Sequence, residues 1–196
     1  MKPFLALFAA VLVASCALLS PPQREPVKEL LSKLPNAISY AHSQAGGLTI
    51  LRPEASPAYD TARMAYTERP YQLGYFRDHE WAAPPAQMIQ KLLVETLERT
   101  GFFRSVVTPP AIAPAGYTLR TAILELMQDY TRAPPLFRLE LRVELLGPSG
   151  HLLASREILM EEPMQAATPD AGVIAANNAL ARALQEAVEL VLAHVR

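Results

Sequence analysis

The fold class is decided by the stretch Leu136-Phe137-Arg138-Leu139-Glu140-Leu141-Arg142-Val143-Glu144-Leu145-Leu146. Apolar side chains alternate with arginines and glutamates along its whole length. Strict alternation is typical of a β-strand with one buried face and one solvated face. The charged face needs no function of its own, since each cross-strand pair of opposite charges contributes under about 1 kcal/mol.

Two further strands are predicted beside this one, at Tyr117–Tyr130 and His151–Glu162. The turn Gly147-Pro148-Ser149-Gly150 predicts a hairpin between the second and third strands. A proline-rich linker at 108–116 precedes the first. The second half of the chain is therefore expected to hold three long antiparallel strands.

Two helices are predicted from apolar spacing and end signals. The first opens at Pro84-Pro85 and ends at Gly101, which suits a left-handed C-terminal position. The second begins after Thr168, a good N-cap, with Pro169 and Asp170 in its first turn. The core-facing residues expected are Met88, Ile89, Leu92, Leu93 and Leu97 in the first helix, and Val173, Asn177, Leu180, Leu184, Ala187, Val188 and Val191 in the second. Alanines at 176, 179, 183 and 187 make the second helix slim enough to lie close to a sheet.

The first half of the chain is predicted to hold shorter elements. We expect a short helix at Val27–Leu34, a chain break at Gly46-Gly47, and a loop at Asp78-His79-Glu80. The strands expected here are Leu48–Leu51, Thr61–Thr67, Tyr71–Phe76 and Phe102–Val107. Together these elements predict an α+β fold, a mostly antiparallel β-sheet with two main helices packed on one face.

The N-terminus has the layout of a bacterial lipoprotein signal. Lys2 precedes a short apolar run that ends in Val13-Ala14-Ser15-Cys16, and Cys16 is the single cysteine of the chain. We expect residues 1–15 to be a signal peptide and Cys16 to be lipidated, with palmitate among its acyl groups. Residues 16–26 then form a proline-rich tether, and 27–196 a single domain. The alternative is an ordinary signal peptide with a chance cysteine near its cleavage site.

Composition narrows the functional classes. The chain is 51% hydrophobic and 19% charged, with a formal net charge of −1. Such a balance gives ample material for a core and no basic field of the kind that nucleic acid attracts. Outside the N-terminal segment, no stretch is long and apolar enough to cross a membrane.

No catalytic or metal-binding motif is present in the sequence. The four histidines (His42, His79, His151 and His194) lack the spacing of metal ligands, and no nucleophile motif or phosphate loop occurs. Asp78-His79-Glu80 is the densest titratable cluster, but adjacent residues on an extended chain point to opposite sides. We therefore predict a protein that is not an enzyme, with no cofactor and no bound metal.

The middle of the chain contains a distinctive series of segments: Leu48–Leu51, Tyr59–Tyr66, Tyr71–Pro85, Met88–Thr100 and Gly101–Val107. A tyrosine-rich strand leads to Trp81-Ala82 and a proline, an amphipathic helix follows, and a strand closes the series. In these features residues 48–107 resemble the ABC-type transport auxiliary lipoprotein family. Family members usually have a Tyr-x-Leu strand soon after the lipidated cysteine, whereas this chain has Tyr40-Ala41-His42 and the expected short helix.

The resemblance implies a role in transport. Family members accompany an ATPase, a permease and an MCE-domain protein that bridges the envelope, in systems thought to move phospholipids or other hydrophobic molecules. It implies docking of the MCE-domain partner, assembly in several copies around an oligomeric partner, and no reaction of its own. Ala17 after the cysteine favours the outer membrane, facing the periplasm.

Partner contact is expected at Tyr75, Arg77, Asp78 and Trp81, where aromatic residues are dense, and at any unpaired sheet edge. For Trp81 the alternative is packing beneath the helix that follows it. Two other functions remain open. A lipid carrier would need an apolar cavity between helix and sheet, and an envelope hydrolase would need polar groups converging on Asp78 and His79.

Overall fold

Strand β8 (Leu136–Leu146) lies between β7 (Tyr117–Asp129) and β9 (Leu152–Pro163) in the computed structural model, which describes residues 25–36, 45–114 and 116–195. Both pairings are antiparallel, and they place Leu141 opposite Ile123 and Ile158. The alternating apolar residues of β8 are each 0–1% exposed. The prediction from residues 136–146 is therefore confirmed.

Strand β7 also pairs with strands from the first half of the chain and so joins that half to the sheet. Three short strands pair with it in parallel: β2 (Ala45–Ile50), β3 (Glu54–Ala55) and β4 (Arg63–Thr67). This arrangement gives the sheet a parallel component that the sequence pattern did not predict. The longest ladders remain antiparallel, and the predicted α+β class is confirmed.

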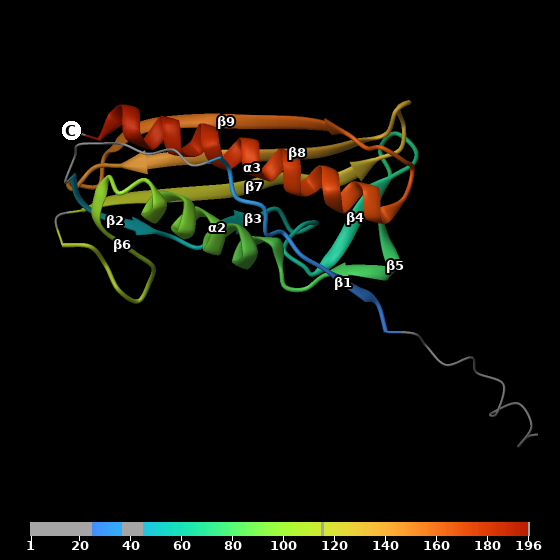
Figure 1. Cartoon of the computed structure of the whole chain (residues 1–196), viewed down its shortest axis with the longest axis horizontal. Coiled ribbons are helices and arrows are strands. Elements are labelled where there is room, and N and C mark those ends of the chain that lie inside the picture. Colours follow the sequence, from blue (N-terminus) through green and yellow to red (C-terminus); the bar gives the residue numbers. More distant parts are fainter. Residues whose placement is uncertain (1–24, 37–44, 115, 196) are drawn as a thin grey trace, which may run out of the picture.

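The remaining strands lie at the sheet margins. Strand β5 (Gly74–Trp81) pairs antiparallel with β4, β6 (Phe103–Val107) pairs in parallel with β2, and β1 (Val27–Glu29) pairs in parallel with β5. Strands β1, β4 and β5 gather at one end of the molecule, with the start of the second helix (Figure 1). Segments far apart in sequence therefore meet at this end.

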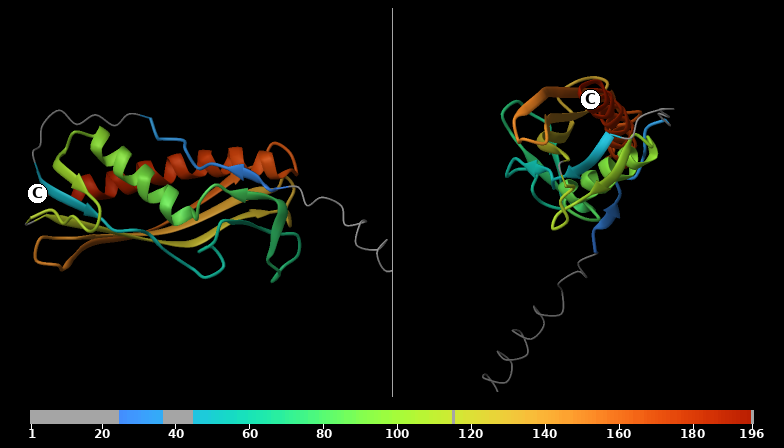
Figure 2. Two further views of the ribbon diagram at one scale, coloured as in Figure 1. Left: turned by 90° about the horizontal axis from the view of Figure 1, so that it is seen from below. Right: turned by 90° about the vertical axis from the view of Figure 1, so that its left-hand side faces the viewer.

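Helices α2 (Pro85–Arg99) and α3 (Pro169–His194) cover the same face of the sheet (Figure 2). The predicted helix ends are confirmed. The Thr168 hydroxyl accepts a hydrogen bond from Ala171 N at the start of α3, and Gly101 adopts a φ of 65° after the end of α2. The alanines at 176, 179, 183 and 187 of α3 are each 0–1% exposed, which lets the helix axis lie close to the strands. One buried cluster joins both helices to the sheet.

The predicted helix at Val27–Leu34 is wrong, since this segment forms β1 and then continues without helix. Asn177 of α3 explains the difference. Its side-chain oxygen accepts from Ser32 N at 2.8 Å and Lys33 N at 3.0 Å, and its amide donates to Leu30 O at 2.9 Å. These bonds supply the backbone partners that a helix would otherwise provide.

Two further local predictions are wrong. Gly47 lies inside β2 rather than at a break, where a Cβ atom would come within 2.4 Å of Ala113 Cβ, so glycine permits this close approach. Residues 78–80 belong to β5 rather than to a loop, because β4 and β1 pair with them on either side.

Several predictions fall outside the described residues. The signal peptide, Cys16 and the segment Tyr40–His42 are among them. Within the described part of the chain, no helix combines the length and the apolar character that a membrane crossing requires.

Candidate functional site

Strand β5 carries all four residues predicted to contact a partner, but it does not present them equally. Arg77 and Asp78 are exposed, and Tyr75 is half-buried. Trp81 is 1% exposed and shares its buried cluster with residues of α2 such as Ile89. The packing alternative is therefore the one that the structure shows for Trp81, and a partner cannot reach this side chain in the folded domain.

Tyr75 is already engaged through its hydroxyl and through one face of its ring. Its hydroxyl donates to Ala58 O at 3.0 Å, and the Arg63 guanidinium lies 3.8 Å from the ring centroid. A cation over an aromatic face contributes about 0.5–1 kcal/mol at exposed sites. Tyr75 thus fastens the loop before β4 to β5 and offers a partner part of its ring.

The turn before β5 presents two large exposed side chains that are not among the predicted contact residues. Tyr71 is fully exposed and Leu73 is 41% exposed. Gln72 N donates to Arg69 O at 3.2 Å, so Pro70 and Tyr71 are the two central residues of this turn. Tyr71 has a φ of 65°, at the position where a type II turn ordinarily holds glycine.

Tyrosine is an unusual residue at a turn position that requires a positive φ. A left-handed conformation costs an L-residue roughly 1–2 kcal/mol, and the exposed ring gains no burial in return. Local departures of this kind are expected at functional sites. We define the β5 surface as Tyr71, Leu73, Tyr75, Arg77 and Asp78.

An open hollow lies beside this turn. Its lining includes Tyr71 and Leu73 of the turn together with Tyr59, Asp129 and Arg138. Arg138 holds an ion pair with Glu125 at 3.1 Å and lies 3.9 Å from Asp129. Burial nevertheless raises the pKa of Glu125, with Arg138 opposing that rise. The lining of the hollow therefore combines apolar side chains with the charged groups of Asp129 and Arg138.

The Tyr59 phenol gives a prediction for alkaline pH. Burial, assisted by Glu125, raises the pKa of Tyr59 to about 12. The folded chain then keeps this proton at pH values where the unfolded chain has released it, so stability is lost as the pH rises from about 10 to about 12. Tyr59→Phe is expected to make the fall of unfolding free energy between about pH 9 and about pH 11 shallower than in the wild type.

Urea unfolding at the two pH values measures this effect. Tyr71→Phe, which alters a fully exposed ring, is the matched control and should keep the wild-type slope. An equal slope in Tyr59→Phe and wild type would contradict the assignment.

The titratable cluster Asp78-His79-Glu80 does not converge. Asp78 is exposed, and Glu80 forms an ion pair with Lys28. His79 turns to the other side, where its Nδ1 lies 3.1 Å from Glu29 Oε1. The arrangement that a hydrolase would need around Asp78 and His79 is therefore not formed by these neighbours.

The layer between helices and sheet is filled by side chains. Leu93, Leu184, Val188 and Leu141 are each 0–1% exposed within it. Four hollows among the described residues lie at the surface and have charged residues in their linings, such as Lys91 and Glu95 over α2. This packing gives no support to an acyl-chain cavity.

Comparisons with known proteins agree with the fold. A family model described as the ABC-type transport auxiliary lipoprotein component matches residues 30–188. Among solved structures, protein XCC0632 from Xanthomonas campestris, of the DUF330 family, is similar, with a TM-score of 0.73 and 22% identity over 86% of this chain and 95% of that one. An uncharacterised protein has a TM-score of 0.70 and 15% identity over 86% and 99%.

A more distant structure, the hypothetical protein CT253 from Chlamydia trachomatis, has a TM-score of 0.54 and 10% identity, covering 76% of this chain and 97% of that one. At these identities the structures establish similarity of fold alone. No curated protein sequence is significantly similar to the chain.

Proposed function

Because this chain belongs to the ABC-type transport auxiliary lipoprotein family, we propose that it docks an MCE-domain partner of such a transport system and assists the movement of lipids or other hydrophobic molecules across the envelope. The observation that carries the proposal is the family match over residues 30–188. The domain acts by binding its partner and catalyses no reaction.

The proposed location is the periplasmic side of the outer membrane. Cys16 stands at the end of a lipobox-like segment, and Ala17 follows it. Acyl groups on Cys16 would anchor the chain firmly, since each buried methylene contributes about 0.8 kcal/mol. Val27, where the described sheet begins, follows Cys16 by eleven positions, so the start of β1 lies at most about 40 Å from the anchor.

The proposed docking site is the β5 surface. It combines an exposed aromatic ring, an exposed leucine and two exposed charges of opposite sign. Tyrosine and arginine are enriched among the residues that dominate binding energy. The conformation of Tyr71 adds support, because the chain keeps a tyrosine where glycine would fit more easily. Several copies of the domain could gather around an oligomeric partner through this surface.

Tyr71→Gly tests the docking site with little change to the fold. Glycine adopts the left-handed conformation without strain, but it also increases the freedom of the unfolded chain, so the two effects on stability nearly cancel. We expect partner affinity to fall about tenfold or more, equivalent to about 1.4 kcal/mol, while the unfolding free energy changes by under about 1 kcal/mol. Binding to the purified MCE-domain protein measures the first quantity, and urea unfolding the second.

Ile112→Ala is the matched control, since Ile112 is 75% exposed and lies outside the β5 surface. It should bind the partner as the wild type does. Full binding by Tyr71→Gly and by a double Arg77→Ala/Asp78→Ala variant would exclude the β5 surface. Capture of stoichiometric lipid from detergent-solubilised envelopes, with no MCE-domain protein, would favour the carrier instead.

A further inference from the structure

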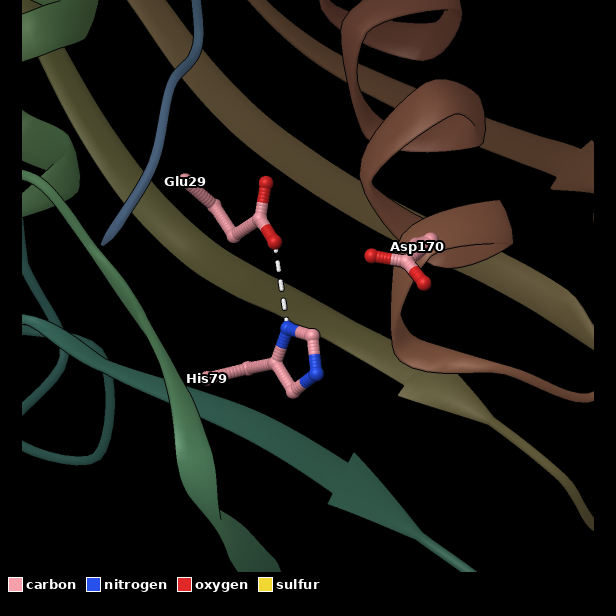
Figure 3. A group of neighbouring side chains, drawn as sticks. All are labelled: Glu29, His79 and Asp170. Atoms are coloured by element: carbon pink, nitrogen blue, oxygen red, sulfur yellow. Dashed lines mark hydrogen bonds and ion pairs between the residues drawn. The ribbon is translucent and has the colours of Figure 1, made fainter. Parts of the chain in front are cut away.

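Three side chains from distant parts of the sequence face one another at the end of the domain where β1, β5 and α3 meet. They are Glu29 of β1, His79 of β5 and Asp170 in the first turn of α3 (Figure 3). One potential ligand atom from each lies within 4.8 Å of the other two. None of these three residues belongs to the β5 surface, although His79 directly follows Asp78 in the sequence.

The geometry points to a binding site for a divalent transition-metal ion such as Zn²⁺, with Glu29, His79 and Asp170 as its three protein ligands. An imidazole and carboxylates are ordinary zinc ligands, and three protein ligands leave a fourth position for water. The imidazole disfavours Mg²⁺ and Ca²⁺, which prefer all-oxygen surroundings.

The distances suit an ion of this size. Zn–N and Zn–O bonds of about 2.0–2.2 Å place neighbouring ligand atoms of a tetrahedral site about 3.3 Å apart. His79 Nδ1 and Glu29 Oε1 already lie 3.1 Å apart. Asp170 is exposed, so rotation of its side chain can bring an oxygen toward the other two. The ion would take the place of the hydrogen that the first pair now shares.

The surroundings also favour a cation here. The Glu29 and His79 side chains are each 16% exposed, so much of their ordinary hydration is already gone. Two carboxylates lie beside one imidazole, and a divalent ion would compensate their charge. Phe76 packs edge-on against the His79 ring, with centroids 6.4 Å apart, and restricts the orientation of that ring.

The proposed ion would fasten the first described strand to the body of the domain. Strand β1 is three residues long and pairs with β5 alone among the described strands. A ligand from β1, one from β5 and one from α3 would hold these elements together. Metal binding would thus control how firmly the segment that follows the tether is held.

Titration of Zn²⁺ into the full-length protein, purified in detergent with an affinity tag that contains no histidine, tests the site by calorimetry. We expect one ion to bind per chain. His79→Gln and Asp170→Asn should each weaken binding at least about tenfold, because even residues that merely orient metal ligands have effects of 10–100-fold. His151→Gln is the matched control, since His151 lies in the hairpin after β8 and contacts Ser149.

A second readout separates a metal site from general destabilisation. Ala82 N donates to Glu29 O at 2.7 Å, so Zn²⁺ should slow hydrogen exchange at the Ala82 amide in the wild type but not in Asp170→Asn. Asp170 is exposed, so this variant should fold even if His79→Gln does not.

The absence of Zn²⁺ binding, or equal affinity in the wild type and Asp170→Asn, would overturn the proposal. Displacement of Zn²⁺ by equimolar Ca²⁺ would overturn the assigned class of ion. All of these measurements are made without a transport partner, so their failure would leave the docking proposal untouched.

Discussion

Replacing Trp81 with alanine is expected to lower the free energy of unfolding by about 3–5 kcal/mol, the range for large aromatic residues removed from a core. Trp81 is 1% exposed at the end of β5, and its buried cluster includes Ala86 and Ile89 of α2. Its removal leaves a cavity where the strand, the helix and the rest of the core meet. Urea or thermal unfolding of the variant measures the loss.

Trp81→Phe separates the packing of the ring from its polar group. The indole Nε1 is buried and has no hydrogen-bond partner among the described residues, so phenylalanine removes an unsatisfied donor together with part of the volume. We expect this variant to lose clearly less stability than Trp81→Ala. A Trp81→Ala variant that unfolds like the wild type would show that the side chain is not in the core.

Leu141→Ala is expected to cost about 2–5 kcal/mol of unfolding free energy. Leu141 is 1% exposed at the middle of β8, opposite Ile123 on one side and Ile158 on the other. Neighbours on the central strands of a sheet cannot easily collapse into the space that a shortened side chain leaves. The loss should therefore include both the transfer free energy and a cavity contribution.

The matched control is Leu159→Ala on the adjacent strand β9. Leu159 is 55% exposed, so its truncation should change the unfolding free energy by no more than about 0.5 kcal/mol. Comparable losses at the two positions would contradict the assignment of the buried face of the sheet.

The long elements could be predicted because their residues carry the signal locally. The alternation in Leu136–Leu146 predicts that this segment is a strand, where the strand begins and ends, and which of its faces is buried. Thr168 and Pro169 mark the start of α3, and Gly101 marks the end of α2. In each case a few neighbouring residues favour one structure strongly.

The short elements could not be predicted because distant residues determine them. Residues 27–34 have no strand pattern of their own, and it is Asn177, well over a hundred positions away, that hydrogen-bonds to this segment beyond β1. The same holds for residues 78–80, which become a strand through pairing with β1 and β4. The parallel partners of β7 have no sequence signal that would distinguish them from antiparallel ones.

The candidate site also combines features that local sequence signals predict with features that depend on distant residues. Aromatic density near Tyr75 directed attention to β5, but it could not separate the buried Trp81 from the exposed Arg77. The exposure of Tyr71 follows from a turn conformation that its sequence does not favour. Ligand spacing along the chain could not reveal the cluster of Glu29, His79 and Asp170, because three separate elements bring these residues together.

The position of β7 in the sheet also determines when this protein can fold. Strands β2, β3 and β4 all take β7 as a partner, and β7 begins at Tyr117. A growing polypeptide emerges from its N-terminus, so the ladders that these strands make with β7 cannot form until more than half of the chain has been made. Pairing between such distant segments is slow, and strands that have not yet paired are prone to aggregate. We therefore expect a nascent chain that stops short of Tyr117 to remain unfolded and to depend on chaperones, with folding a property of the finished polypeptide.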